Sequence, residues 1–447
     1  MNAHTEMTER SPEELWNAIQ DNAPDLYFCP HPFEHLYNDN LGHWALCCRA
    51  YPLDHLVGNT TPEEHWKHPL MEEIRREMLS GNLNHVRKYC WKCLKMEKDG
   101  LTSPRQQLNA ALLKKKAPAK SKVLAIASRM TSNPDEGITF NGRTLELKLR
   151  VYGNYCQLHC YMCSPLNSTS RRDELSEIRD GRWLGCFGAQ DRPDFFESEE
   201  HYDRFIDSAM RLLPYVRKIK ITGGEPFLLP RHFKFLEKIV ATEHARKIRL
   251  SYDTNMARFH LGSDKVFGYL KRFKAVTLAV SIDNLGARND YIRYGSEFNA
   301  VMANVEKART FPGINVVVSC ATGMLNAGDV HDIADFFHQR GLVAKFNMCV
   351  INWPVFLQAR HLPDALKENY LAKLESSPHR AQFSNVIRMI KQPRDEAQYQ
   401  IFLEYLGDLD RHRGTSWLDL WPEFRLHARP VAADSPTPVS PSLPQPV

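Results

Sequence analysis

The chain has 447 residues, of which 43% are hydrophobic and 25% are charged. These proportions are typical of a globular protein with room for two or three domains. Its net charge of +5, from 58 basic and 53 acidic residues, does not indicate nucleic acid as a partner. No stretch approaches the ~20 apolar residues of a membrane span. Residues 1–16 lack the apolar segment of a secretory signal, so we expect a cytoplasmic protein. In a reducing compartment its eleven cysteines are expected first as metal ligands and second as core residues, rather than in disulfides.

The N-terminal part of the chain predicts a small cysteine-rich α+β domain. Residues 1–25 are a polar lead with one helix, in which Ser11 and Glu14 fit a capping box. The domain itself is expected over residues 26–111, with a hairpin first and then a helix that ends at Gly81. Residues 112–142 are charged, contain proline and have no sustained apolar period, which is typical of a linker.

Four cysteines of this domain have spacings that suit a metal centre. Cys29 and Cys47 belong to the pattern C-x12-G-x4-C, in which residues 38–40 supply turn chemistry, and Cys90 and Cys93 form a C-x2-C pair. Four thiolates would close every corner of an iron-sulfur cube, but they also describe a zinc ribbon, and both readings stay open. Cys48 adjoins Cys47 and would point to the opposite face of a strand.

Strands and helices alternate over residues 143–352. This alternation predicts a parallel sheet with right-handed crossovers, in the form of a partial (β/α)6 barrel of the α/β class. The chain then becomes helical over residues 353–427 and ends in a proline- and serine-rich tail, residues 428–447, for which we expect disorder. The predicted strands cover residues 144–151, 216–223, 247–254, 275–282, 314–321 and 343–350.

A second cysteine motif follows the first of these strands. Cys156, Cys160 and Cys163 have the spacing C-x3-C-x2-C in one short loop. Three thiolates leave one iron of a four-iron cube open, and an open position indicates catalysis, since a small molecule can chelate there. A structural zinc site is the alternative, although zinc ligands usually have other spacings.

This loop resembles the signature of the radical S-adenosylmethionine (radical SAM) enzymes, in which the open iron binds the amino and carboxylate groups of the cofactor. The resemblance implies that Met162 lies beside the adenine. It also implies that Gly223, Gly224 and Glu225, which end the second strand, hold the amino group of the cofactor's methionine.

Small polar side chains stand at the ends of the next strands. Asn255, Ser281 and Asp283 occupy places where a ribose or carboxylate of the cofactor would lie, but such residues also cap helices routinely. Arg293 is a candidate for the methionine carboxylate or a surface arginine. Residues 167–198 form a long polar insertion that we interpret as a lid or a substrate contact.

The N-terminal cysteine pattern is similar to the twitch and SPASM auxiliary-cluster domains that accompany many radical SAM enzymes. Those domains are expected after the barrel, whereas here the pattern precedes it. The resemblance implies a second 4Fe-4S cluster on Cys29, Cys47, Cys90 and Cys93. Cys48 is an alternative to Cys47 as a ligand, Cys186 is a candidate substrate contact in the insertion, and Cys320 and Cys349 are expected in the core.

Together these resemblances imply a radical SAM enzyme that reductively cleaves S-adenosylmethionine at a 4Fe-4S cluster. The resulting 5'-deoxyadenosyl radical would abstract a substrate hydrogen atom, with a reducing partner such as ferredoxin or flavodoxin supplying the electron. Auxiliary clusters often accompany enzymes that modify peptides or proteins, which is the leading expectation for the substrate. A small metabolite or nucleotide is the alternative, and a non-catalytic, zinc-stabilised binding module is an alternative of a different class.

Overall fold

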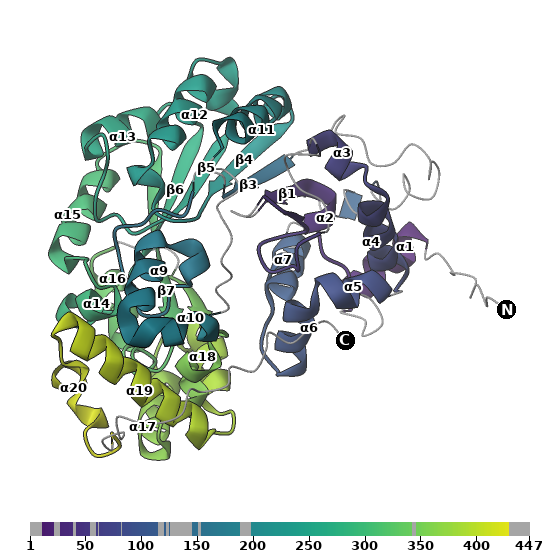
Figure 1. Cartoon of the computed structure of the whole chain (residues 1–447). Coiled ribbons are helices and arrows are strands. Elements are labelled where there is room, and N and C mark those ends of the chain that lie inside the picture. The colour runs from purple at the N-terminus through teal and green to yellow at the C-terminus, as the bar shows by residue number, and fades with distance from the viewer. Residues whose placement is uncertain are drawn as a thin grey trace. The chain divides into compact units, whose positions relative to one another are not determined.

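The structure is a computed structural model of the whole chain, shown in Figure 1. It describes residues 11–21, 27–38, 42–53, 60, 62–81, 83–114, 120–121, 125, 145–150, 153–187, 198–341 and 346–428. The chain divides into two units. The first comprises Met1–Val151, Asp194–Lys220 and Pro444–Val447, and the second comprises Tyr152–Pro193 and Ile221–Leu443. Most of the predicted linker, the predicted tail and residues 39–40 of the predicted turn lie outside the described residues.

The first unit contains the N-terminal cysteines. Its first helix begins at a capping box, as predicted, because the Ser11 and Glu14 side chains bond each other's backbone N–H groups. The predicted hairpin is present too, since Tyr37 and Asn38 pair antiparallel with Ala45 and Trp44. The elements in chain order are α1 Pro12–Gln20, α2 His31–Glu34, β1 His35–Asn38, β2 Trp44–Ala45, α3 Pro62–Trp66, α4 Pro69–Ser80, α5 Asn84–Tyr89, α6 Trp91–Lys98, α7 Pro104–Leu113, β3 Leu145–Leu149, α11 Glu199–Leu212 and β4 Val216–Ile221.

The N-terminal hairpin also joins the strand that was predicted to open the barrel. Strand β1 pairs in parallel with β3, with Leu36 opposite Leu147, and the strand order in this unit is β2-β1-β3-β4. This pairing groups β3 with the N-terminal region, whereas the sequence pattern predicts a domain boundary near residue 143. The side chains of Leu36 and Leu147 are buried, and their shared burial stabilises the pairing.

One helix predicted from the sequence is two helices in the structure. The break falls at His68, whose ring nitrogen accepts a hydrogen bond from the Leu70 N–H group and so caps α4. Proline at position 69 explains the break, because it fixes the first turn of a new helix and disfavours helical geometry in the residue before it. Helix α4 ends, as predicted, at Gly81 in the left-handed conformation.

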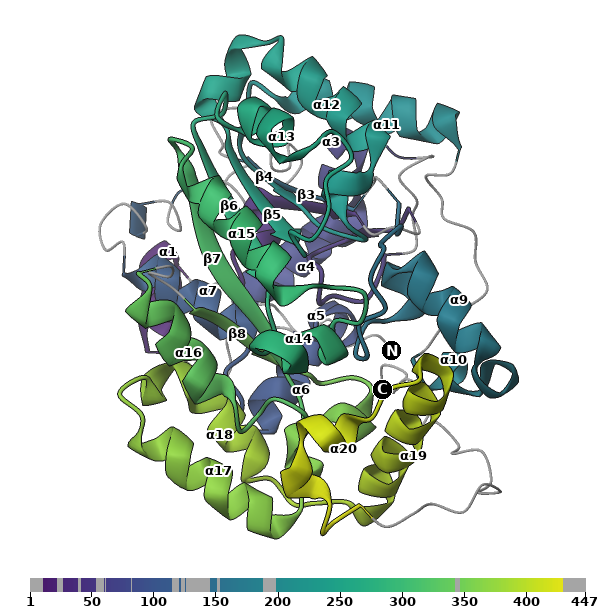
Figure 2. The same cartoon turned by 90° about the vertical axis from the view of Figure 1, so that its left-hand side faces the viewer.

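The second unit carries the remaining parallel strands and the helices that cross between them. Thr254 pairs with Val280, Ser281 with Ser319, and Cys320 with Met348, so the strand order is β5-β6-β7-β8. Helices α13, α15 and α16 lie along one face of these strands (Figures 1 and 2). The elements are η4 Pro226–Leu228, α12 Pro230–Val240, η5 Glu243–Lys247, β5 Arg249–Thr254, α13 Ser263–Leu270, β6 Ala275–Ser281, α14 Gly286–Ile292, α15 Phe298–Arg309, β7 Ile314–Thr322, α16 Val330–Gln339 and β8 Phe346–Val350.

All six predicted strands are therefore present, and the fold is mixed α/β with parallel strands and helical crossovers, as predicted. Every second side chain of a strand points to the same face, and on β5 and β6 the pairs Leu250 and Tyr252, and Val276 and Leu278, are buried in this way. The predicted helical extension is also confirmed. It consists of η6 Val355–Leu357, η7 Ala359–His361, α17 Asp364–Ser376, η8 Arg380–Phe383, α18 Ser384–Ile390, α19 Glu396–Arg413, α20 Trp417–Leu420 and η9 Pro422–Phe424.

Much of the interval predicted as a long polar insertion is helical. It contains η1 Pro165–Asn167, α9 Thr169–Glu177, η2 Ile178–Gly181 and α10 Arg182–Cys186. These helices pack beside α19, which is visible in both views (Figures 1 and 2). Leu175 and Trp183 are fully buried there, and the Trp183 indole N–H donates to Asp408 at 2.9 Å. No helix in the described part of the chain is long and apolar enough to cross a membrane.

Candidate functional site

The cysteine loop of the second unit is held by its backbone. The N–H groups of His159 and Tyr161 donate to the carbonyls of Tyr294 and Ile292, at 2.9 and 3.0 Å. Cys160 lies between His159 and Tyr161 and is buried, whereas Cys156 and Cys163 are half-buried. The loop turns back at its end, where the Cys163 N–H donates to the Cys160 carbonyl at 3.0 Å. The three thiols are thus presented by a fixed segment.

The three thiols are close enough to affect one another electrostatically. Burial raises the pKa of the Cys156 thiol, and negative charge on Cys160 and Cys163 would raise it further. The Leu158 N–H group opposes this shift by bonding the Cys156 sulfur, and the Asn255 amide lies 3.6 Å from the same sulfur. Clustered, buried thiols become thiolates readily only when a cation compensates their charge. The donor set therefore fits an iron-sulfur cluster.

The Gly223–Gly224 turn lies directly against the start of this loop. The Glu225 N–H donates to the Tyr155 carbonyl at 2.8 Å. A Cβ atom on Gly224 would lie 2.3 Å from that carbonyl oxygen, and Gly224 and Gly223 both have positive φ values, +42° and +95°. Only glycine allows this approach without displacing the loop. The two sequence motifs are therefore joined by a backbone contact.

Glu225 places a carboxylate in the interior beside the cysteine loop. It is 1% exposed, and it accepts hydrogen bonds from the Thr254 hydroxyl at 2.7 Å and the Asn255 N–H at 2.6 Å. Burial raises the pKa of Glu225 to about 7, and the hydrogen bonds from Asn255, Thr254 and Phe227 limit the rise. A buried carboxylate with this pKa would be stabilised in its charged form by an ammonium group.

Asn255 links the two motifs through its side chain. Its amide group contacts Cys156, and its Oδ1 accepts a hydrogen bond from the Gln157 amide at 3.2 Å. Gln157 and Thr254 were not predicted as site residues. The position of Thr254 at a strand end beside Asn255 could have predicted it as a site residue. Nothing in the sequence distinguishes Gln157 from other polar residues of the motif.

The other predicted cofactor residues are distributed around the same strand ends. Ser281 is half-buried at the end of β6, and Met162 is half-buried within the cysteine loop. Asp283 is 1% exposed and is bonded on both oxygens, by the Ala321 N–H and the Arg293 guanidinium, each at 2.7 Å. Arg293 thus pairs with a carboxylate of the chain itself.

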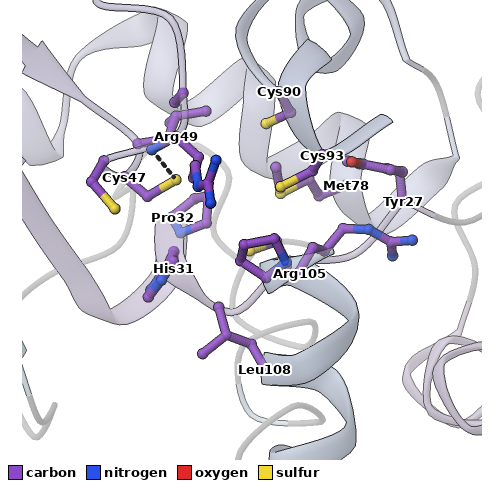
Figure 3. A pocket seen from close by; sticks show the side chains of 15 residues that line it. Tyr27, His31, Pro32, Cys47, Arg49, Met78, Cys90, Cys93, Arg105 and Leu108 are labelled. Carbon is purple, nitrogen blue, oxygen red and sulfur yellow. Dashed lines mark hydrogen bonds between the residues drawn. The ribbon is translucent and has the colours of Figure 1, made fainter. Parts of the chain in front are cut away.

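The four N-terminal cysteines line one cavity of the first unit (Figure 3). Cys29 and Cys93 are buried, and Cys47 and Cys90 are half-buried. Figure 3 shows Cys47 on one side of the cavity and Cys90 and Cys93 on the other. After burial, the charge of Cys47 is the largest influence that raises the pKa of both the Cys29 and the Cys90 thiol. Cysteines from a hairpin and from a later pair are thus brought together.

Backbone N–H groups point at three of these four sulfurs. His31 donates to Cys29, Arg105 donates to Cys93, and Arg49 donates to Cys47 at 3.4 Å. Such N–H···S bonds stabilise a thiolate and tune an attached cluster. Burial nevertheless raises the pKa of Cys47 to about 12, so the thiolate form needs a further cation. The cavity fits a group held by four thiolates.

Residues 151–337 match the family model described as the Radical SAM superfamily. This part of the chain is similar to the radical SAM superfamily. Matches among solved structures include anSMEcpe with bound AdoMet, at 17% identity over 51% of this chain and 62% of that one, with a TM-score of 0.33. They also include Streptococcus suis SuiB bound to the precursor peptide SuiA, at 14% identity over 68% of this chain and 56% of that one, with a TM-score of 0.34. These alignments span less than two thirds of either relative, and no curated protein matches the chain.

The radical SAM match begins at the cysteine loop and includes Glu225 and the strand ends that carry Asn255, Ser281 and Asp283. It therefore contains every site residue predicted in the second unit. The family implies a 4Fe-4S cluster and AdoMet. The match excludes the N-terminal cysteine cavity and helix α19.

The remaining cysteines differ in exposure. Cys320 is fully buried, as predicted, with its sulfur 3.8 Å from the Thr322 hydroxyl. Cys349 is exposed on β8, so the prediction that it lies in the core is wrong. Cys186 is buried at the end of α10. Cys48 is exposed.

The contact between the glycine turn and the cysteine loop generates a prediction. Gly224→Ala should displace the loop, because its Cβ would overlap the Tyr155 carbonyl. We expect the variant to retain markedly less iron at its three-cysteine site after anaerobic reconstitution, measured as iron per chain. Gly268→Ala is the matched control: Gly268 lies in α13 with nothing within 4 Å of the added atom, and alanine favours a helix. Equal iron content in the two variants would contradict the role assigned to this contact.

Proposed function

We propose that this chain is a radical SAM enzyme that holds a 4Fe-4S cluster on Cys156, Cys160 and Cys163. One observation carries the proposal: the buried Glu225 carboxylate and the cysteine loop are joined by the Glu225–Tyr155 backbone bond. The cluster and S-adenosylmethionine, when bound, supply reductive cleavage of the sulfonium and abstraction of a substrate hydrogen atom. The chain's own residues bind, orient and shield these groups.

The roles of the individual residues follow from their surroundings. Glu225 offers the cofactor's ammonium group a carboxylate that is already fixed by Thr254 and Asn255, so little ordering is needed on binding. Gly223 and Gly224 let the backbone approach the ligand. Ser281 and Asn255 are assigned to the ribose or carboxylate, and Met162 to the adenine. Asp283 acts through Arg293, which it orients.

We further propose a second 4Fe-4S cluster on Cys29, Cys47, Cys90 and Cys93. The N–H···S bonds to three of these sulfurs support a thiolate-bound group. A cluster is favoured over zinc because the three-cysteine loop of the same chain is itself proposed to hold a 4Fe-4S cluster.

A peptide or protein is the proposed substrate class. This assignment depends on the second cluster, since such auxiliary clusters accompany peptide-modifying members of the family. A small metabolite or nucleotide is the alternative if the N-terminal cavity binds zinc. The electron would come from a small reducing protein such as ferredoxin or flavodoxin.

Cofactor cleavage tests the activity directly. With dithionite, the reconstituted protein should slowly convert S-adenosylmethionine to 5'-deoxyadenosine even without substrate, measured by chromatography. Cys160→Ala should abolish the product, because two thiolates leave the cluster without a full set of ligands. Undiminished product from a variant with Cys156, Cys160 and Cys163 all changed to alanine would overturn the proposal.

The carboxylate of Glu225 generates a separate binding prediction. Glu225→Gln should weaken S-adenosylmethionine binding roughly 10- to 100-fold, since a charge-assisted hydrogen bond contributes about 1.5–3 kcal/mol. Iron content should stay at the wild-type level, which distinguishes lost binding from a lost cluster. Equilibrium binding to the reconstituted protein gives the affinity, and unchanged affinity would show that the ammonium group binds elsewhere.

The metal content of the N-terminal cavity decides whether it binds a 4Fe-4S cluster or a zinc ion. Wild-type protein should hold about eight irons, and Cys90→Ala/Cys93→Ala about four. The double variant should still cleave S-adenosylmethionine, provided that circular dichroism shows a folded protein. Four irons and one zinc in the wild type would make the cavity a zinc site, and the peptide assignment would then lose its support.

A further inference from the structure

Two arginines outside the metal-binding motifs meet at one buried carboxylate behind the cysteine loop. Arg171 and Glu174 come from α9, and Arg413 is the last residue of α19. Their side chains are 0%, 4% and 1% exposed. Arg413 donates to both Glu174 oxygens, at 2.7 and 3.0 Å, and Arg171 donates to Glu174 Oε2. We call Arg171 and Arg413 the arginine pair, and Glu174 their shared carboxylate.

Both arginines also reach the cysteine loop. Arg413 Nη2 donates to the His159 carbonyl at 2.5 Å, and Arg171 Nη2 donates to the Tyr161 carbonyl at 3.3 Å. The Tyr405 hydroxyl, from α19, donates to the same Tyr161 carbonyl at 2.5 Å. His159 and Tyr161 are the two neighbours of Cys160. Because their N–H groups are bonded to Tyr294 and Ile292, all four backbone polar groups that flank this cysteine are held.

The arginine pair and its shared carboxylate together carry a net positive charge. Burial would raise the pKa of Glu174, but the hydrogen bond from Arg413 and the charges of Arg171 and Arg413 bring it below its usual value, so the carboxylate is ionised. Two guanidiniums and one carboxylate leave a charge of +1. Both guanidiniums bond the carbonyls of the residues directly before and after Cys160. A buried charge acts more strongly than an exposed one, because water screens it less.

This arrangement has a consequence for electron transfer into the cluster, which rests on the proposed function. Reduction adds one electron, and hence one negative charge, to a group already bound by three thiolates. A nearby buried positive charge stabilises the reduced form, and both charge and hydrogen bonding tune the potentials of iron-sulfur clusters.

We propose that Arg413 and Arg171 are positioning residues that fix the Cys160 segment by its carbonyls and raise the reduction potential of the cluster. The C-terminal helix α19 thereby gains a function in the radical chemistry, although it lies outside the residues that match the family model. The helix supplies Arg413 and Tyr405, both from its buried face.

The test is an electron paramagnetic resonance titration of the full chain against potential, after anaerobic reconstitution. The signal of the three-cysteine cluster is identified as the one that changes when S-adenosylmethionine is added. Arg413→Gln should shift its midpoint to a more negative potential, and Arg413→Lys, which keeps the charge, should lie closer to wild type. Arg411→Gln is the matched control: it removes the same charge from the same helix, but its side chain is 64% exposed, so the midpoint should not move.

If the Arg413→Gln protein holds the cluster and its midpoint potential equals that of the wild type, the inference is overturned. If that variant holds no cluster, Tyr405→Phe decides, because it removes the hydrogen bond to the Tyr161 carbonyl and the one accepted from Arg171, but no charge. It should lose iron to a chelator several-fold faster than wild type, and wild-type retention would overturn the positioning role. Absence of any S-adenosylmethionine-sensitive cluster in the wild type would instead refute the proposed function.

Discussion

The structure around the site depends on one constraint: three thiols in a short loop must be held together although their charged forms repel one another. Cys156 shows the conflict, since burial and its neighbouring thiols both raise the pKa of its own thiol. The chain resolves the geometric part of this conflict through the backbone. The Ile292–Tyr294 segment, the Glu225 N–H, and the side chains of α9 and α19 all bond the loop. The loop is thus preorganised by elements that are distant in sequence.

Two of the three buried carboxylates beside the loop form ion pairs with arginines of the chain. Glu225 is the exception: its hydrogen bonds come only from neutral groups, Thr254, Asn255 and Phe227, and its pKa is raised. Asp283 and Glu174, by contrast, each have an arginine partner. A carboxylate that lacks a cation in direct hydrogen-bond contact is the natural site for a ligand cation. This difference explains why one of three buried carboxylates near the loop is assigned to binding and two to structure.

The four thiols of the N-terminal cavity must also be held together although their charged forms repel one another. Its thiols come from before α2, after β2, the α5–α6 junction and α6 itself, and N–H groups rather than long side chains are aimed at the sulfurs. Arg105 lies beside this cavity but is bonded to Glu97, at 2.7 and 3.0 Å, so it contributes little net charge. Four thiolates would therefore depend on the bound metal for their compensation.

The sequence alone determined the cysteine spacings, the glycine-glutamate motif and the six parallel strands, because each is a local pattern within a few residues. Tertiary structure alone decided three features. Strand β1 joins β3 across more than a hundred residues of chain. The polar interval after the cysteine loop folds into helices against α19. Arg171, Glu174 and Arg413 look like surface charges at a helix start and a helix end, yet packing buries them around Cys160. Burial of a charge depends on which distant groups satisfy it, and local periodicity contains no information about those partners.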